Sequence, residues 1–152
     1  MYYFEDIEVG SKRAFGSYAV TREEVLEFAR KYDPQPFHLS DEAAAETHFG
    51  KLAASGWHTA SMAMAMNVAE MQKHPERQAA SLGAIGIDEL RWLKPVYPGD
   101  VLRSESEVLE KRASASRPEM GILKLQTTVF NQDDAPVMRF TALAMVKTRP
   151  VG

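Results

Sequence analysis

An acidic side chain and an imidazole lie five residues apart in the segment Asp33-Pro34-Gln35-Pro36-Phe37-His38. The two prolines fix their own φ angles and push Asp33 and Gln35 toward extended backbone, so we expect a stiff segment that is not helical. A rigid carboxylate beside an imidazole can hold a water molecule and move its protons. The same spacing also suits a plain connector, in which the aspartate caps a turn and the histidine is solvated.

Two helices are expected to flank this segment. Thr21 and Glu24 form the pattern of a capping box, which predicts a helix that starts at Thr21 and runs to about Tyr32, with the Glu24 side chain reaching back to the cap. Ser40 caps a second predicted helix, from Asp41 to about His48, which Phe49-Gly50 should end. The aspartate and histidine would therefore lie in the elbow between two short helices.

A third helix is predicted over Ala60–Gln72, a run rich in alanine and methionine that is apolar nearly all round. We expect this helix to be buried on most faces, with its methionines filling the core. Ser55-Gly56 lies at its start, where backbone N–H groups are free and carry the positive end of the helix dipole. Glycine also lets a ligand approach the backbone closely. An ordinary serine or glycine cap explains the same two residues.

The rest of the chain is predicted to form a β-sheet. Segments rich in branched and aromatic residues predict strands, and no crossover helix separates the later ones, so we expect antiparallel pairing. The predicted strands are Lys12–Val20, Ala84–Leu93, Val101–Ser114, Gly121–Asn131 and Val137–Lys147.

Composition narrows the classes of function. We expect 152 residues without a linker or repeat to form a single domain over residues 1–152. The absence of cysteine excludes disulfides and thiolate chemistry, and the four histidines show no metal-ligand spacing, so no metal site is predicted. A net charge of −3 gives no reason to expect a nucleic-acid partner. With no signal peptide indicated and no membrane-spanning run, a cytoplasmic location is expected.

The motifs together resemble the MaoC-like dehydratases, which are relatives of the (R)-specific enoyl-CoA hydratases. The resemblance is carried by the Asp33–His38 segment, by the sequence Ala-Ser-Gly-Trp-His-Thr that ends at Thr59, and by the run Asp88–Asp100. It also extends to Ser114–Pro118 and to Asn131-Gln132. Where the family usually has asparagine two residues after the aspartate, this chain has Gln35, which carries the same amide group.

The resemblance implies an α+β hotdog fold, in which a curved antiparallel sheet wraps a long central helix. It further implies a hydro-lyase of fatty acid metabolism that adds water to a trans-2-enoyl-CoA thioester, or removes it, without a cofactor beyond the CoA of the substrate. Asp33 and His38 would be catalytic and would hold the water, the Gly56 N–H would receive the thioester oxygen, and Gln35 and Ser55 would contact substrate. Family members generally form at least homodimers.

Two other functions fit the same fold. A hotdog thioesterase would place an acidic residue on the central helix, and Glu70 is the only acid between Ala60 and Gln72. A non-catalytic protein that binds acyl thioesters would not need Asp33 and His38 together. The sequence leaves the identity of the acyl chain and the direction of the reaction open.

Overall fold

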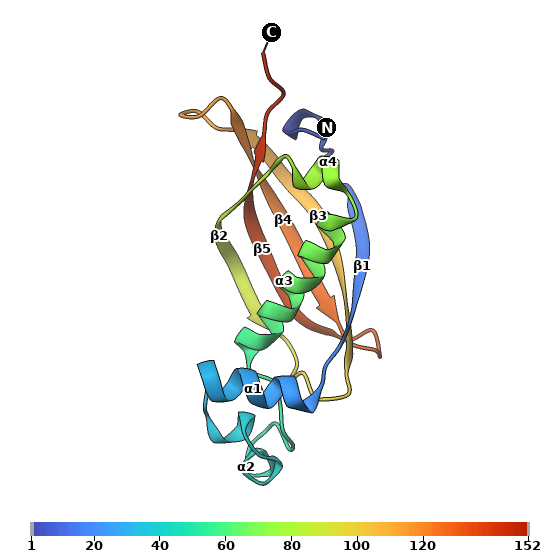
Figure 1. Cartoon of the computed structure of the whole chain (residues 1–152), viewed down its shortest axis with the longest axis vertical. Coiled ribbons are helices and arrows are strands. Elements are labelled where there is room, and N and C mark those ends of the chain that lie inside the picture. The colour runs from blue at the N-terminus through green and yellow to red at the C-terminus, as the bar shows by residue number, and fades with distance from the viewer. Residues whose placement is uncertain (1, 152) are drawn as a thin grey trace.

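The computed structural model describes residues 2–151. Five antiparallel strands form one sheet in the order β1-β3-β4-β5-β2, and helix α3 lies across one face of this sheet (Figure 1). The strands are β1 (Lys12–Ala19), β2 (Ser81–Trp92), β3 (Val101–Ala113), β4 (Met120–Phe130) and β5 (Pro136–Lys147). All five lie where the sequence predicts strands, to within a few residues at each end, and the antiparallel pairing is confirmed.

Helices α1 and α2 lie at one end of the molecule, near the first turn of α3, whereas α4 follows the last turn of α3 toward the other end (Figure 1). The helices are α1 (Arg22–Tyr32), α2 (Asp41–Ala45), α3 (Gly56–Gln72) and α4 (Pro75–Gln78), with short 3₁₀ turns η1 (Phe4–Asp6) and η2 (Pro36–His38). This is the α+β arrangement of a helix against an antiparallel sheet that the sequence leads us to expect. Within residues 2–151, no helix is long and apolar enough to cross a membrane.

Helix α1 has the predicted bounds, but its first turn differs from the prediction. The Thr21 hydroxyl accepts a hydrogen bond from the Glu24 N–H at 3.2 Å, as a capping residue does. The Glu24 side chain does not reach back to Thr21. It contacts Tyr18 of β1 and His58 of α3 instead, so the second half of the capping box is wrong.

Two local predictions between α1 and α3 are also wrong. Helix α2 ends at Ala45 rather than near His48, because the Thr47 hydroxyl and the Gly50 N–H both donate to the Ala44 carbonyl and draw the chain into a turn. Pro36–His38 was predicted not to be helical, yet it forms one 3₁₀ turn. Proline is tolerated at the first helical position, because the N–H that it lacks would have no partner there.

Helix α3 begins at Gly56, four residues before the predicted start. Its inner face carries Met62, Ala63 and Met66, which are at most 3% exposed and pack against Leu102, Val129 and Met138 of the sheet. The prediction that it is buried on most faces is wrong, because the sheet covers one side only. Met64 is 50% exposed and Val68 is 38% exposed on the opposite side.

The close packing of α3 on β1 depends on Gly16. This residue has φ +86°, and a Cβ atom there would lie 2.7 Å from the Met66 sulfur and 3.0 Å from its Cβ. Gly10 has a similar φ of +89° but no atom within 4 Å of the same position. The two glycines therefore share one backbone conformation and differ in their surroundings.

Gly16→Ala is expected to destabilise the protein more than Gly10→Ala. In both variants the free energy of unfolding falls by about 1–2 kcal/mol, because an L side chain is forced into the left-handed region. Only Gly16→Ala must also displace Met66, which adds about 1–3 kcal/mol. Urea denaturation of the two variants and the wild type measures this difference, and equal losses would show that Met66 yields without cost.

Candidate active site

Asp33 lies at the junction of α1 and the elbow that follows it. Its N–H donates to the Ala29 carbonyl at 2.9 Å and closes the last turn of the helix. The next residue is Pro34, which cannot continue the hydrogen-bond pattern. Asp33 adopts φ −150° and ψ 67°, outside the helical region. The chain thereby turns the Asp33 carboxylate away from α1 and toward the start of α3.

Both oxygens of the Asp33 carboxylate accept hydrogen bonds. The Ser55 hydroxyl donates to Oδ2 at 2.7 Å, and the Gln35 amide donates to Oδ1 at 2.6 Å. Burial alone would raise the pKa of Asp33, but these two hydrogen bonds, together with the positive charge of His38 in its protonated form, outweigh it and lower the pKa below its ordinary value of 3.8. The carboxyl is therefore held in its charged form and in one orientation.

His38 is 5% exposed and is oriented by the backbone that leads into α3. Its Nδ1 lies 2.7 Å from the Ala53 carbonyl, which can only accept, so Nδ1 carries the proton and donates it. In the neutral ring the lone pair then lies on Nε2, which is 3.5 Å from Asp33 Oδ2. Two acceptors at that distance do not bond to each other, but one water molecule can donate to both.

Ser55 and Gly56 begin α3. Ser55 is fully buried, and its hydroxyl accepts from the Trp57 N–H at 3.3 Å while donating to Asp33. The Gly56 N–H belongs to the first turn, where no carbonyl of the helix can accept from it. The five residues named from the sequence, Asp33, Gln35, His38, Ser55 and Gly56, thus lie around one junction between α1 and α3.

The structure gives two of these residues a neighbour that sequence reasoning did not anticipate. Gln35 binds the Asp33 carboxylate itself, so it orients the acid directly. The place that a Cβ on Gly56 would take is held by Trp92, whose indole atoms lie 2.5–2.8 Å from that position. Trp92 also donates to the Gly56 carbonyl at 2.9 Å. Glycine is needed here for the close approach of the indole, whatever its N–H does.

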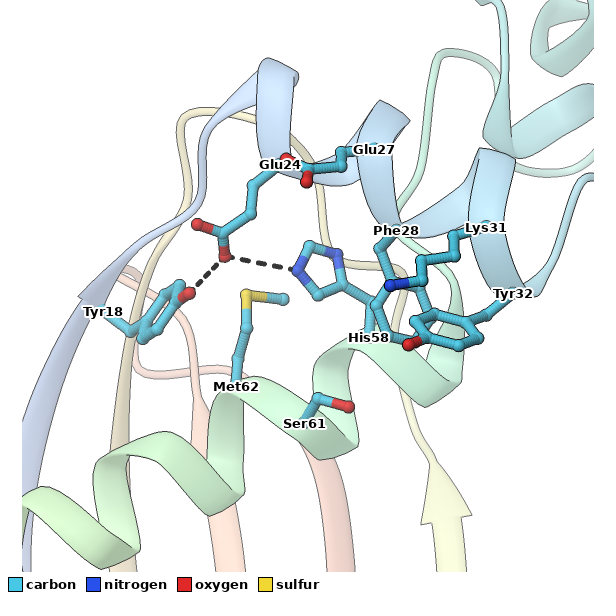
Figure 2. A pocket seen from close by; sticks show the side chains of 9 residues that line it. All are labelled: Tyr18, Glu24, Glu27, Phe28, Lys31, Tyr32, His58, Ser61 and Met62. Atoms are coloured by element: carbon cyan, nitrogen blue, oxygen red, sulfur yellow. Dashed lines mark hydrogen bonds and ion pairs between the residues drawn. The ribbon is translucent and has the colours of Figure 1, made fainter.

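A cavity of about 300 Å³ lies beside this junction, between β1, α1 and α3 (Figure 2). It is lined by Tyr18, Glu24 and His58 at one end and by Lys31 and Tyr32 toward the other. Asp33 and His38 do not line it. Sequence reasoning missed the contacts of Glu24 with Tyr18 and His58, because Glu24 also fits the local pattern of a capping box.

The sequence profile of the MaoC like domain matches residues 6–129, which include all five candidate-site residues and the residues that line the cavity. The chain belongs to this family. It is 38% identical to a MaoC-like dehydratase from Rhodospirillum rubrum, whose crystal structure superposes with a TM-score of 0.86 over 98% of this chain and 99% of that one. It is 27% identical to the (R)-hydratase from A. caviae, with a TM-score of 0.67 over 95% and 99% of the two chains.

Curated relatives include two enzymes of CoA thioesters. The chain is 33% identical over 71% of its length to 3-hydroxybutyryl-CoA dehydratase of Methylorubrum extorquens, and it spans 64% of that protein. It is 35% identical over 49% of its length to mesaconyl-CoA hydratase of Cereibacter sphaeroides, of which it spans 22%. A protein of Mycobacterium tuberculosis described as a double hotdog fold, 21% identical, superposes with a TM-score of 0.73 over 99% of this chain and 45% of that one, which identifies the fold as hotdog.

Ser55→Ala is expected to raise the pKa of Asp33, because it removes the hydroxyl that donates to Oδ2. Carboxyl titration by ¹³C NMR measures this shift. Folding lowers this pKa, so the stability linked to it is present above the unfolded value of 3.8 and is lost as the pH falls through the lower folded value. The variant should lose part of this acid-sensitive stability.

Ser40→Ala is the matched control. Ser40 caps α2 by accepting from the Ala43 N–H at 3.1 Å, and it does not bond to Asp33. Loss of either cap costs about 1 kcal/mol. Ser40→Ala should therefore destabilise the protein to a similar degree while leaving the Asp33 titration unchanged. An equal shift in both variants would show that the hydroxyl of Ser55 does not set this pKa.

Proposed function

We propose that this protein catalyses the reversible hydration of trans-2-enoyl-CoA thioesters to 3-hydroxyacyl-CoA. The observation that supports this function most directly is the pair of acceptors at the α1–α3 junction, Asp33 Oδ2 and His38 Nε2, 3.5 Å apart. The relatives named as a 3-hydroxybutyryl-CoA dehydratase and an (R)-hydratase favour the same chemistry. Because the chain spans only part of the dehydratase, the whole-protein activity is extended to it as a proposal.

In the proposed mechanism the water molecule donates one hydrogen bond to each member of the pair. As its oxygen bonds to the β-carbon of the enoyl group, one member takes a proton from the water. The same member then delivers that proton to the α-carbon on the same face, so that H and OH of one water add across the double bond. Positioned acid–base groups of this kind contribute about 10²–10⁴ in rate.

Negative charge develops on the thioester oxygen during this addition. The Gly56 N–H, at the first position of α3, is the donor that we assign to it. The dipole of the 17-residue helix adds the equivalent of about half a positive charge at the same end. Substitution of Gly56 is a poor test of this assignment, because any Cβ would first displace Trp92.

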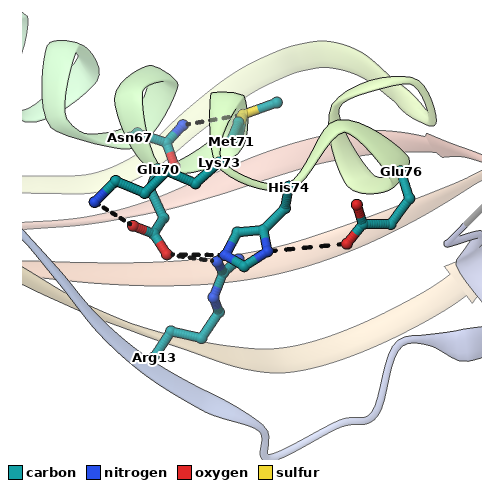
Figure 3. Close-up of polar contacts among 7 residues, drawn as sticks. All are labelled: Arg13, Asn67, Glu70, Met71, Lys73, His74 and Glu76. Carbon is teal, nitrogen blue, oxygen red and sulfur yellow. Dashed lines mark hydrogen bonds and ion pairs between the residues drawn. The ribbon is translucent and has the colours of Figure 1, made fainter.

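The thioesterase alternative needs a free acid on α3, and the geometry disfavours it. Glu70 lies at the far end of the helix and is bound by Arg13 at 3.0 Å, His74 at 3.3 Å and Lys73 at 3.8 Å (Figure 3). Burial would raise the pKa of Glu70, but the hydrogen bond from His74 and the two cations outweigh it and lower the pKa. A carboxylate held by three partners is poorly placed to act as a base.

Crotonyl-CoA distinguishes the candidate functions in one assay. A hydratase removes the absorbance of the enoyl thioester without releasing thiol, whereas a thioesterase releases free CoA. A non-catalytic binder does neither, although it shows saturable binding by calorimetry. Thiol release at the rate of substrate loss would contradict the proposed function.

Asp33→Asn and His38→Ala are each expected to lower turnover of crotonyl-CoA by about 10²-fold or more, since each removes one of the two groups that move protons. His48→Ala is the control, because His48 lies in the same region but is exposed and contacts Phe49 rather than the site. Thermal unfolding checks that all three variants fold. Retention of more than about half the turnover in either active-site variant would remove that residue from the mechanism.

We also propose that the protein is a homodimer or a higher homo-oligomer. Strand β2 forms one edge of the sheet, with β5 as its only neighbouring strand in residues 2–151. Ile85 and Ile87 on β2 are 54% and 48% exposed, and Met64 and Val68 of α3 add to the apolar surface. An unpaired edge with exposed apolar side chains is a surface that a second copy would cover.

Light scattering of the wild-type protein at micromolar concentration is expected to give a multiple of the 17.0 kDa chain mass. The double variant Ile85→Lys with Ile87→Lys should shift the mass toward that of one chain, because it places two charges where the partner strand would lie. Leu109→Lys, at an exposed position on β3, serves as the control. A wild-type mass of one chain would contradict the proposed assembly.

A further inference from the structure

Three elements meet on one carboxylate oxygen outside the candidate active site. Oε1 of Glu24 on α1 accepts a hydrogen bond from the Tyr18 hydroxyl of β1, and the same oxygen lies 3.4 Å from Nε2 of His58 on α3 (Figure 2). These residues are 6 and 34 positions from Glu24 in the chain. The contact therefore joins β1, α1 and α3.

The buried position of His58 does not require an imidazole for packing. His58 is 3% exposed and stacks on Phe28, with ring centroids 4.8 Å apart and planes 9° apart. Its Nδ1 is buried and has no hydrogen-bond partner within residues 2–151. Burial lowers the pKa of His58 against the opposing effect of Glu24, so the ring is neutral and Nε2–H is the proton that it donates. A leucine would fill this space without leaving a nitrogen unpaired.

The contact lies beside a cavity between α1 and α3, next to the stacked pair of Phe28 and His58. The cavity of about 300 Å³ lies between the two helices, and Glu24 and His58 line it. The other charged groups that line it are Glu27 and Lys31, both exposed and both on α1. Because the cavity interrupts the packing of the two helices here, the Glu24–His58 contact adds a polar restraint to the packing of Phe28 on His58.

A second polar contact joins the same helices at the active site. Ser55, the cap of α3, donates to Asp33 at the C-terminal end of α1, while Glu24 in the first turn of α1 accepts from His58 in the first turn of α3. Together with the apolar packing of Val25 and Phe28, the two polar contacts at opposite ends of α1 hold its orientation.

We infer that Glu24 and His58 are positioning residues for the active site: their contact fixes α1 against α3 and so holds the Asp33 carboxylate against Ser55 and beside the Gly56 N–H. The inference rests on the proposed function for its effect on turnover. Its effect on Asp33 is independent of that function. If the contact is broken, the Ser55–Asp33 hydrogen bond loosens, and both the reacting geometry and the titration of Asp33 change.

Four variants test this role. His58→Leu and Glu24→Ala remove the contact, and Glu24→Gln is the conservative variant, because its amide oxygen still accepts from His58 and Tyr18. Glu27→Ala is the matched control, since Glu27 lies on the same helix and lines the same cavity. Each variant is assayed for kcat and KM with crotonyl-CoA, for stability in urea, and for the Asp33 titration by ¹³C NMR.

His58→Leu and Glu24→Ala are expected to lower kcat by about tenfold to a hundredfold, the loss that a misplacement near 1 Å produces. KM should stay within about twofold, because substrate binding groups are untouched. The Asp33 titration should move to higher pH in both variants. Glu24→Gln and Glu27→Ala should retain most of the activity, and His58→Leu should be at least as stable as the wild type.

The inference is overturned if the Asp33 titration and kcat are unchanged in His58→Leu, or if activity falls only with the fraction of folded protein. A wild type that hydrates no enoyl-CoA would refute the proposed function. In that case a shift of the Asp33 titration in both disruptive variants still supports the positioning role, and an unshifted titration refutes it.

Discussion

The hydrogen bond from the Ser55 hydroxyl to Asp33 Oδ2, 2.7 Å long, joins the end of α1 to the start of α3, and the candidate site depends on it. It places a charged carboxylate at the N-terminus of α3, where the helix dipole stabilises negative charge. It also holds that carboxylate 3.5 Å from the His38 imidazole. Without it, the Asp33 side chain would lose its hydrogen bond to the first residues of α3.

The rest of the fold supplies what this contact requires. The sheet packs against Met62 and Met66 and so fixes α3 as the reference element. Backbone groups before α3 complete the arrangement, because the Ala53 carbonyl sets the tautomer of His38. The opposite face of α3 and the edge strand β2 are left exposed. The candidate pair of Asp33 and His38 is thus held by contacts within this chain, and the exposed apolar residues of α3 and β2 form a separate surface.

The chain contains two pairs of a carboxylate and an imidazole at similar distances, 3.5 Å for Asp33 with His38 and 3.4 Å for Glu24 with His58. The hydrogen-bond partners of the two histidines indicate different roles for the two pairs. In the first pair, Nδ1 of the histidine is bound to a carbonyl and Nε2 is left as an acceptor for water. In the second, Nε2–H is donated to the carboxylate and Nδ1 is buried without a partner. The first arrangement suits proton transfer, and the second suits the joining of two helices.

The sequence alone determined the elements and much of the site: the caps at Thr21, Ser40 and Ser55, the five strands, and the stiff segment that carries Asp33 and His38. These features depend on residues close in the chain, whose periodicity and hydrogen bonding are readable from their order. Only the tertiary structure decided that the Glu24 side chain contacts His58 rather than Thr21, that Trp92 lies against Gly56, and that α3 is buried on one side only. Each of these depends on residues more than thirty positions apart or on a whole layer of the fold, and no local pattern encodes which distant partner a side chain meets.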